Sequence, residues 1–272
     1  EARDLDLAKD LQQSANPVIE DELSAESRPN SDDGDIDHSE SFTNWQLLQV
    51  MAGGLTGNVL EWFDFSVYTA VASELGQNFF PESEAQLIAS LAIFAASFLM
   101  RPLGGMVFGH IGDRYGRKTA LVISISLMAA SSLAMGLMPT YATIGLAAPL
   151  ALGLLKCAQG LSVGGEMVGS MLFLCEYASR RQRGFFGSTV FASSTVGITL
   201  GVAVVAVLRM HLTEEEMLSY GWRIPFVAGV GIALVACWLR FALEEPPAFR
   251  QLQESSAVAR NPLRTAVTKH WK

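Results

Sequence analysis

Two acidic residues lie inside a stretch that is otherwise apolar and aromatic. The stretch reads GNVLEWFDFSVY from Gly57 to Tyr68, and its only charges are Glu61 and Asp64. Steps of four, three and four residues place Gly57, Glu61, Asp64 and Tyr68 on one face of a helix. Two carboxylates one turn apart repel each other when both are ionised, so such a pair is suited to holding a proton. The pattern therefore indicates a proton-coupled site.

Three further ionisable residues, Arg101, Lys156 and Glu166, stand in long apolar segments. Each would cost several kcal/mol at the centre of a bilayer unless it is paired or hydrated. Depth counted along straight helices matches Glu61 and Asp64 with Lys156, and Arg101 with Glu166. Two interpretations stay open at this point. The charges are either ion pairs that lock helices together, or groups that line a polar pathway between helices.

The segment from Gly160 to Gly164 contains the GxSxG string of a nucleophile elbow. That motif needs a strand, a sharp turn and a helix, whereas here it stands inside a long apolar segment without a plausible histidine partner. We therefore do not expect an enzyme. Glycines four residues apart predict close approach of helices instead. The pairs are Gly160/Gly164, Gly165/Gly169, Gly105/Gly109 and Gly197/Gly201.

The three cysteines, Cys157, Cys175 and Cys237, lie far apart in apolar segments and form no CxxC pattern. We interpret them as small packing residues and expect neither a disulfide nor a metal site. No other motif suggests a cofactor.

Long apolar segments must position these residues. Half of the 272 residues are hydrophobic, and the segment from Thr119 to Leu155 contains no charge. As a single helix it would be roughly 55 Å long, nearly twice the bilayer core of about 30 Å, so it must fold back, and Pro139 to Tyr141 is the natural turn. The same reasoning predicts an all-α, polytopic membrane protein. Its six expected spans are 47–72, 86–109, 119–138, 143–175, 185–208 and 222–243.

The net charge of −8 is concentrated in the N-terminal tail. The first 40 residues hold 13 of the 27 acidic residues and 3 of the 19 basic ones, which leaves 14 acids against 16 bases elsewhere. Such a polar, like-charged tail cannot bury enough surface to offset its ordering entropy. We expect residues 1–44 to be a disordered acidic tail, and nothing in the charge pattern indicates a nucleic-acid partner.

The distribution of basic residues predicts an orientation. They gather after the second, fourth and sixth spans, whereas the loops after the first and third spans have none. The residues are Arg114, Arg117 and Lys118, then Arg180, Arg181 and Arg183, then Arg250, Arg260, Arg264 and Lys269. By the positive-inside rule both ends of the helical region lie in the cytoplasm.

The loop GHIGDRYGRK, from Gly109 to Lys118, resembles the signature between helices two and three of the major facilitator superfamily. Asp113 and Arg117 can pair at a spacing of four. Four more segments resemble the metabolite:proton symporter family, which includes proline/betaine, citrate, α-ketoglutarate and shikimate carriers. They are GNVLEWFDFSVY, RPLGG from Arg101, QGLSVGGE from Gln159 to Glu166, and GWRIPF from Gly221 to Phe226.

The resemblance implies roles for particular residues. Glu61 and Asp64 match acids of the first helix that serve proton coupling or solute contact, and Gln159 and Glu166 match polar positions of the fourth helix. Lys156 stands where the family usually has arginine, and it lacks the bidentate fork of that residue. A cytoplasmic charge network that gates alternating access is implied for the loop positions. They are Gly109, Asp113, Arg114, Gly116, Arg117 and Lys118, together with Glu176.

The family fold has twelve helices in two six-helix halves. The chain is therefore expected to be the N-terminal half, with a bundle at 45–245 and a cytoplasmic segment at 246–272 leading to a missing second half. The function this implies is proton-coupled symport of a small organic solute, an organic acid or a betaine/proline-type osmolyte, across a bacterial cytoplasmic membrane. The proton gradient supplies the energy. An alternative is a non-transporting half that binds or regulates. Without its second half, the face carrying the charged residues is expected to meet lipid, or a second copy of the chain.

Overall fold

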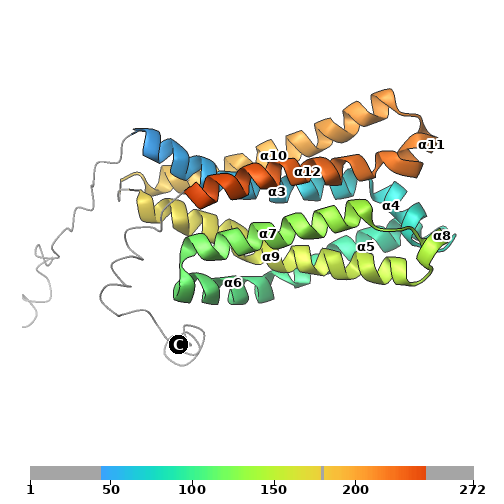
Figure 1. The fold of residues 1–272 in the computed structure, drawn as a ribbon, viewed down its shortest axis with the longest axis horizontal. Coiled ribbons are helices and arrows are strands. Elements are labelled where there is room, and N and C mark those ends of the chain that lie inside the picture. Colours follow the sequence, from blue (N-terminus) through green and yellow to red (C-terminus); the bar gives the residue numbers. More distant parts are fainter. Residues whose placement is uncertain (1–43, 179–180, 243–272) are drawn as a thin grey trace, which may run out of the picture. The chain divides into compact units, whose positions relative to one another are not determined.

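The computed structural model describes residues 44–178 and 181–242, which are mostly helical and include no strand. The expected acidic tail, apart from its last residue, lies outside the described residues, as does the expected cytoplasmic segment 246–272. The helices and their connections form the main unit of the chain (Figure 1).

Among the described residues, six stretches of helix are long enough to cross a bilayer. They are α3 (Asn44–Ala70), α5 (Gln86–Leu99) continued by α6 (Arg101–Tyr115), α7 (Arg117–Leu137), α9 (Ala147–Tyr177), α10 (Arg183–His211) and α12 (Arg223–Ala242). Shorter elements connect them: α4 (Ala72–Phe79), α8 (Tyr141–Ile144), α11 (Glu214–Glu216) and the π-helix η1 (Met217–Gly221). In Figure 1, α4, α8 and α11 gather at one end of the bundle.

The six predicted spans correspond to these six stretches, but only five of them are apolar enough to qualify as membrane spans by composition. The exception among the described helices is α3, the expected first span. It carries Asn58, Glu61 and Asp64, whose side chains are at most 1% exposed. These polar side chains face the neighbouring helices, and the fold places α3 inside the bundle despite its lower hydropathy.

Two local features shape the spans. The expected turn near Pro139 is present: α7 ends at Leu137, and one turn of helix, α8, precedes α9. The second span is interrupted at Met100, between α5 and α6. Pro102 has no N–H, and its ring crowds the carbonyl of Phe98, which is sufficient reason for a break at this point. The break places Arg101 at the start of α6.

α3 packs mainly against α10 and α12, and α9 packs against α5, α6 and α7. Glycines make the closest approaches possible, as predicted. A Cβ on Gly160 would overlap the carbonyl of Ser97, and one on Gly164 would overlap that of Arg101. Gly197 and Gly201 meet α3 in the same way. The prediction was wrong for Gly109, because a Cβ there would have nothing within 4 Å.

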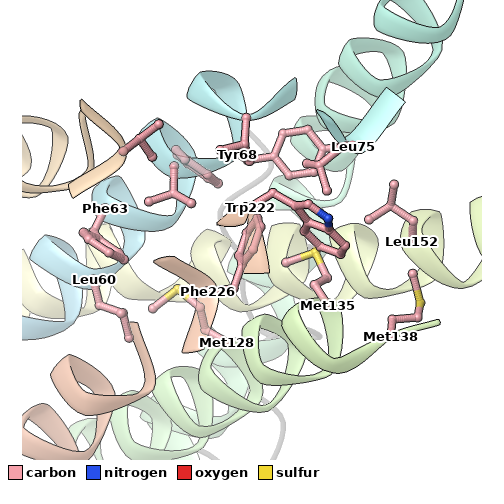
Figure 2. Packing of buried hydrophobic residues seen from close by; sticks show 14 of the residues in the cluster. Leu60, Phe63, Tyr68, Leu75, Met128, Met135, Met138, Leu152, Trp222 and Phe226 are labelled. Carbon is pink, nitrogen blue, oxygen red and sulfur yellow. The ribbon is translucent and has the colours of Figure 1, made fainter. Parts of the chain in front are cut away.

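The hydrophobic core lies where α3, α7 and α12 meet the connecting elements. Trp222 is fully buried and contacts Phe79 and Phe226 edge to face, with ring centroids 5.3 and 6.4 Å away. Figure 2 shows Trp222 beside Met135, with Leu60 and Phe63 of α3 further along the same cluster. This core fixes α3 against α12 and so sets the position of the polar face of α3.

Candidate functional site

The polar face of α3 is buried inside the bundle. Glu61 and Asp64 are each 1% exposed, and Lys156 is 0% exposed. For these three residues the expectation that the face would meet lipid in the absence of further helices was therefore wrong, whereas the Arg101 side chain is 26% exposed. α7 and α9 cover Asp64, and α6 supplies the nearest cation to Glu61.

Asp64 is the centre of one polar group. Its Oδ2 accepts hydrogen bonds from the Ser132 hydroxyl and from Gln159 Nε2, the latter at 3.0 Å. Gln159 Nε2 also donates to Ser132 Oγ at 2.8 Å, and its Oε1 accepts from Lys156 Nζ at 2.7 Å. The predicted association of Asp64 with Lys156 is thus present through Gln159, which joins the two charges in one chain of hydrogen bonds.

Glu61 is held much more loosely. Its only ion-pair partner in the described chain is Arg101, with Nη2 to Oε1 at 4.0 Å. Neither oxygen of Glu61 has a hydrogen-bond partner among the described residues, and the same holds for Nε and Nη2 of Arg101. The pair therefore has unused hydrogen-bonding capacity on both sides, which buried polar groups rarely leave.

The predicted pairing of Arg101 with Glu166 was wrong. Glu166 instead forms a bidentate ion pair with Arg240 of α12, through both guanidinium nitrogens Nη1 and Nη2. Counting depth placed Arg101 level with Glu166, and its backbone does lie against Gly164. Its side chain, however, contacts Phe65 and Phe98 and approaches Glu61 instead. Depth alone also cannot tell which helices are neighbours.

Both carboxylate oxygens of Glu166 have hydrogen-bond partners. The carboxylate also accepts from Ser124 at 3.0 Å and from Ser170 at 3.2 Å. Arg240 donates in addition to the carbonyl oxygens of Gly53 at 2.9 Å and Leu121 at 2.7 Å. The cluster therefore ties together α3, α7, α9 and α12.

Sequence reasoning missed Arg240. It lies inside the predicted span 222–243, and this position was the available signal. A basic residue so close to a span end is commonly one that extends toward the membrane interface. In the structure its side chain is only 2% exposed.

Aromatic rings surround the two cations of the site. Lys156 Nζ lies 4.2, 5.3 and 5.7 Å from the ring centroids of Tyr68, Phe94 and Phe65. The guanidinium carbon of Arg101 lies 4.1 Å from the ring of Phe98 and 4.8 Å from that of Phe65. Phe65 therefore contacts both cations.

Asn58, one residue after Gly57, was also missed. Its Nδ2 donates at 2.8 Å to the Val190 carbonyl and to the hydroxyls of Ser193 and Ser194, all on α10. A polar residue one turn from Glu61 was the signal in the sequence. The contact fixes α3 against α10 close to the charged face.

The loop between α6 and α7 contains the predicted ion pair. Arg117 Nη1 lies 2.7 Å from Asp113 Oδ1, and its Nε lies 3.4 Å from Glu176 Oε1 on α9.

The other residues expected in this loop have separate contacts. Gly116 has φ of 110°, a conformation in which glycine has no steric cost. Lys118 donates to the Phe241 carbonyl at 2.9 Å. Arg114 instead lies over the ring of Tyr115, at 5.3 Å.

The opposite end of the bundle has an ion pair that the sequence did not predict. Arg209 of α10 contacts Glu74 of α4 at 2.7 Å and the Ala70 carbonyl at 3.0 Å.

Ser162 of the GxSxG string lies within α9, so the strand and turn of a nucleophile elbow are not present there. Among the described residues no group of three or more histidine, cysteine or acidic side chains could hold a metal ion.

Comparisons with known proteins agree with this fold. The family described as "Sugar (and other) transporter" matches residues 50–270. The "Proline/betaine transporter" of Salmonella typhimurium (strain LT2) is 44% identical over 241 residues, covering 84% of this chain and 48% of that protein. A "Glycine betaine/proline/ectoine/pipecolic acid transporter" of Dickeya dadantii is 44% identical over 248 residues, covering 87% of this chain and 50% of that protein. The chain thus spans about half the length of the curated relatives it matches.

Among solved structures, the proton:xylose symporter XylE, described as a protein of the major facilitator superfamily, matches with a TM-score of 0.71. The match covers 79% of this chain and 48% of that one, at 18% sequence identity. It shows that the two share a fold.

Proposed function

The chain belongs to the sugar (and other) transporter family of the major facilitator superfamily, and from this premise we propose that it forms the solute- and proton-binding half of a proton-coupled carrier for a small organic solute. It is an integral membrane protein with a half-length major facilitator fold, and its family consists of transporters rather than enzymes.

The observation that carries the proposal is the set of charged side chains buried among membrane-length helices. Glu61, Asp64 and Lys156 are at most 1% exposed, and Arg101 lies beside them. Charges in such a position are costly and are usually functional. An acid between movable cations can take up a proton in one arrangement and release it in another. We assign this role to Glu61 and Asp64, with Gln159 and Lys156 as the connected partners.

Glu166, by contrast, is assigned a structural role in the carrier. Its carboxylate already accepts hydrogen bonds from Arg240, Ser124 and Ser170, so all its strong interactions are within the fold. The functional pathway then consists of Glu61, Asp64, Arg101, Lys156 and Gln159.

The network around Arg117 is proposed to hold one conformation of the carrier. Arg117 connects the α6–α7 loop to α9 through Asp113 and Glu176. Movement of α9 relative to α6 would break one of these contacts. We propose that this loop faces the cytoplasm and that the end carrying α4, α8 and α11 faces outward, because the basic residues of the loop follow the positive-inside rule.

The solute class is proposed from the relatives, whose names include proline and betaine. These are zwitterions, and both acidic and basic groups line the proposed pathway. An organic acid remains the second candidate, because Arg101 and Lys156 would also bind a carboxylate.

The test is uptake of radiolabelled glycine betaine, proline and citrate, with and without a proton uncoupler. It is run in cells that produce the chain alone, and in cells that also produce the C-terminal half of the Salmonella relative. Uncoupler-sensitive accumulation of a zwitterion in either arrangement supports the proposal. Solute binding by the purified chain without accumulation in either would favour a binding or regulatory half.

A further inference from the structure

Lys156 has an unusual environment for an ammonium group. An ammonium has three donors, and the only hydrogen-bond partner found for it in the described chain is Gln159 Oε1 at 2.7 Å. Its remaining surroundings include the rings of Tyr68, Phe94 and Phe65 at 4.2, 5.3 and 5.7 Å. All three distances are within the reach of about 6 Å over which a ring face attracts a cation.

The three rings form a pre-assembled group rather than a chance contact. Tyr68 and Phe94 stack with centroids 5.4 Å apart, and Phe65 meets Phe94 edge to face at 5.5 Å. Tyr68 is fixed further by the hydrogen bond from its hydroxyl to the Ser90 carbonyl at 3.0 Å. Helices α3 and α5 therefore build an aromatic cage, defined as Phe65, Tyr68 and Phe94, and α9 inserts a cation into it.

The aromatic residues next to the cage extend toward the surface of the described bundle. Tyr68 and Lys156 are fully buried, but Phe94 is only half-buried and the adjoining Phe98 is 39% exposed. Phe94 and Phe98 meet edge to face at 5.2 Å, so the aromatic group continues to the surface of the described bundle. A solute entering past Phe98 would meet Phe94 and then the cation.

A group that can bind a carboxylate also contacts Phe65. Arg101 stacks on Phe65 and Phe98, and its Nε and Nη2 have no hydrogen-bond partner among the described residues. Nε and one Nη are donors of the guanidinium fork that matches a carboxylate. Glu61 approaches only to 4.0 Å, and it is 1% exposed with both oxygens lacking hydrogen-bond partners. The geometry thus offers one place for a cation and one for an anion, and both are next to Phe65.

We propose that the aromatic cage of Phe65, Tyr68 and Phe94 binds the ammonium end of a zwitterionic solute, a methylated or cyclic ammonium with a carboxylate, and that Lys156 occupies the cage when no solute is bound. The solute's carboxylate binds Arg101. Lys156 is then a tethered competitor that the solute must displace. This inference rests on the proposed function and specifies its solute class.

A lysine suits this position because the solute must be able to displace its ammonium group from the aromatic cage. The ammonium of lysine is a compact charge on a flexible stem, so it can fill a cage made for a small cation and also leave it. Aromatic faces also recognise quaternary ammonium groups, which have no N–H to donate. A cage with few hydrogen-bond acceptors therefore favours the methylated cation over the lysine ammonium once both compete for it.

The first experiment measures binding of radiolabelled tetramethylammonium to the purified chain in lipid nanodiscs. The parent should bind it weakly, because Lys156 fills the cage. Lys156→Met keeps the stem but removes the charge, and it should raise the affinity about tenfold, since one cation–π site is freed. Lys156→Arg keeps the charge and should leave the affinity low.

Ring deletions show where the probe binds. In the Lys156→Met background, Phe94→Leu should lower the affinity about fivefold, because one face of the cage is lost. Phe79→Leu removes a buried ring of the main core and serves as the matched control. It should leave tetramethylammonium binding unchanged. Elution volume and thermal melting confirm that each variant is folded.

A competition assay tests the cation directly in the parent protein, so it does not depend on any variant folding. Glycine betaine should displace bound tetramethylammonium, whereas 3,3-dimethylbutyrate should not. The latter has the same shape and carboxylate but no positive charge. Equal displacement by both compounds, no saturable binding to the parent or Lys156→Met, or no rise in affinity in a folded Lys156→Met variant would each overturn the proposal.

The two proposals can fail separately. If tetramethylammonium binding follows the predicted order while no uptake assay shows accumulation, the cage stands and the proposed carrier function is wrong. If zwitterion uptake is uncoupler-sensitive but substitutions of Lys156 and Phe94 do not change tetramethylammonium affinity, the carrier function is supported and the proposed cage is wrong.

Discussion

Two buried ion pairs of this protein have opposite character. Glu166 and Arg240 share a bidentate contact, and hydroxyls and backbone carbonyls satisfy their remaining atoms. Glu61 and Arg101 face each other at 4.0 Å, and four of their polar atoms have no hydrogen-bond partner in the described chain. A satisfied pair fixes the fold, whereas a loose pair can exchange partners. We therefore distinguish charges that stabilise the fold, Glu166 and Arg240, from charges that take part in the proposed transport, such as Glu61.

The largest expected effect comes from breaking the satisfied pair. Arg240→Leu leaves the Glu166 carboxylate buried without its cation, and it removes donors from the Gly53 and Leu121 carbonyls. Loss of one partner of a buried pair typically costs about 3–5 kcal/mol. Thermal melting of the purified chain, and its amount in the membrane, should both fall strongly. A melting temperature like that of the parent would show that the cluster is not structural.

A smaller loss is expected from crowding the same pair. A Cβ on Gly57 would overlap the Glu166 carboxylate and the Arg240 guanidinium. Gly57→Ala should therefore destabilise the chain by about 1–3 kcal/mol, as overpacking commonly does. The matched control is Gly231→Ala on α12, where a Cβ would have nothing within 4 Å. That variant should melt at or slightly above the parent temperature. Equal melting of both variants would contradict the close approach at Gly57.

Neutralising the loose pair should cost little stability. Glu61→Gln removes a charge that forms no hydrogen bond in the described chain, and Arg101 keeps its contacts with Phe65 and Phe98. We expect a change in unfolding free energy below about 1 kcal/mol. Glu166→Gln, compared under the same conditions, should lose several times more. Similar losses in both variants would erase the distinction between the two pairs.

The smallest effect on stability is expected in the α6–α7 loop. Asp113 is 42% exposed, so its ion pair with Arg117 contributes only about 0.2–1 kcal/mol. Asp113→Asn should slow solute turnover in an uptake assay while leaving solute binding largely intact, because Arg117 also holds Glu176. A large loss of binding with normal turnover would count against a gating role.

Local patterns predicted a large part of this molecule. Spacing alone placed Glu61 and Asp64 on one buried face, and it predicted the contact between Asp113 and Arg117. Hydrophobic runs located all six long helices, because their period and length do not depend on tertiary contacts.

The sequence did not predict which helices are neighbours. Glu166 pairs with Arg240, 74 residues away, because α9 and α12 both pack against α3 and α7, and Gly57 of α3 leaves room for both side chains. Arg101 lies at the level of Glu166, with its backbone against Gly164, but its side chain is directed to Glu61 and Phe65, which depth along the helix does not reveal. The aromatic cage likewise depends on α3, α5 and α9 meeting, which no single segment reveals.

The most direct test of the central claim follows the protons themselves. Infrared difference spectroscopy of the purified chain, titrated between acidic and alkaline pH, detects protonated carboxyl groups through their carbonyl band. We expect a titrating buried carboxyl in the parent and in Glu166→Gln, and its loss in the double variant Glu61→Gln with Asp64→Asn. A band that persists unchanged in the folded double variant, or that disappears in Glu166→Gln, would contradict the assignment of Glu61 and Asp64 as the proton-carrying pair.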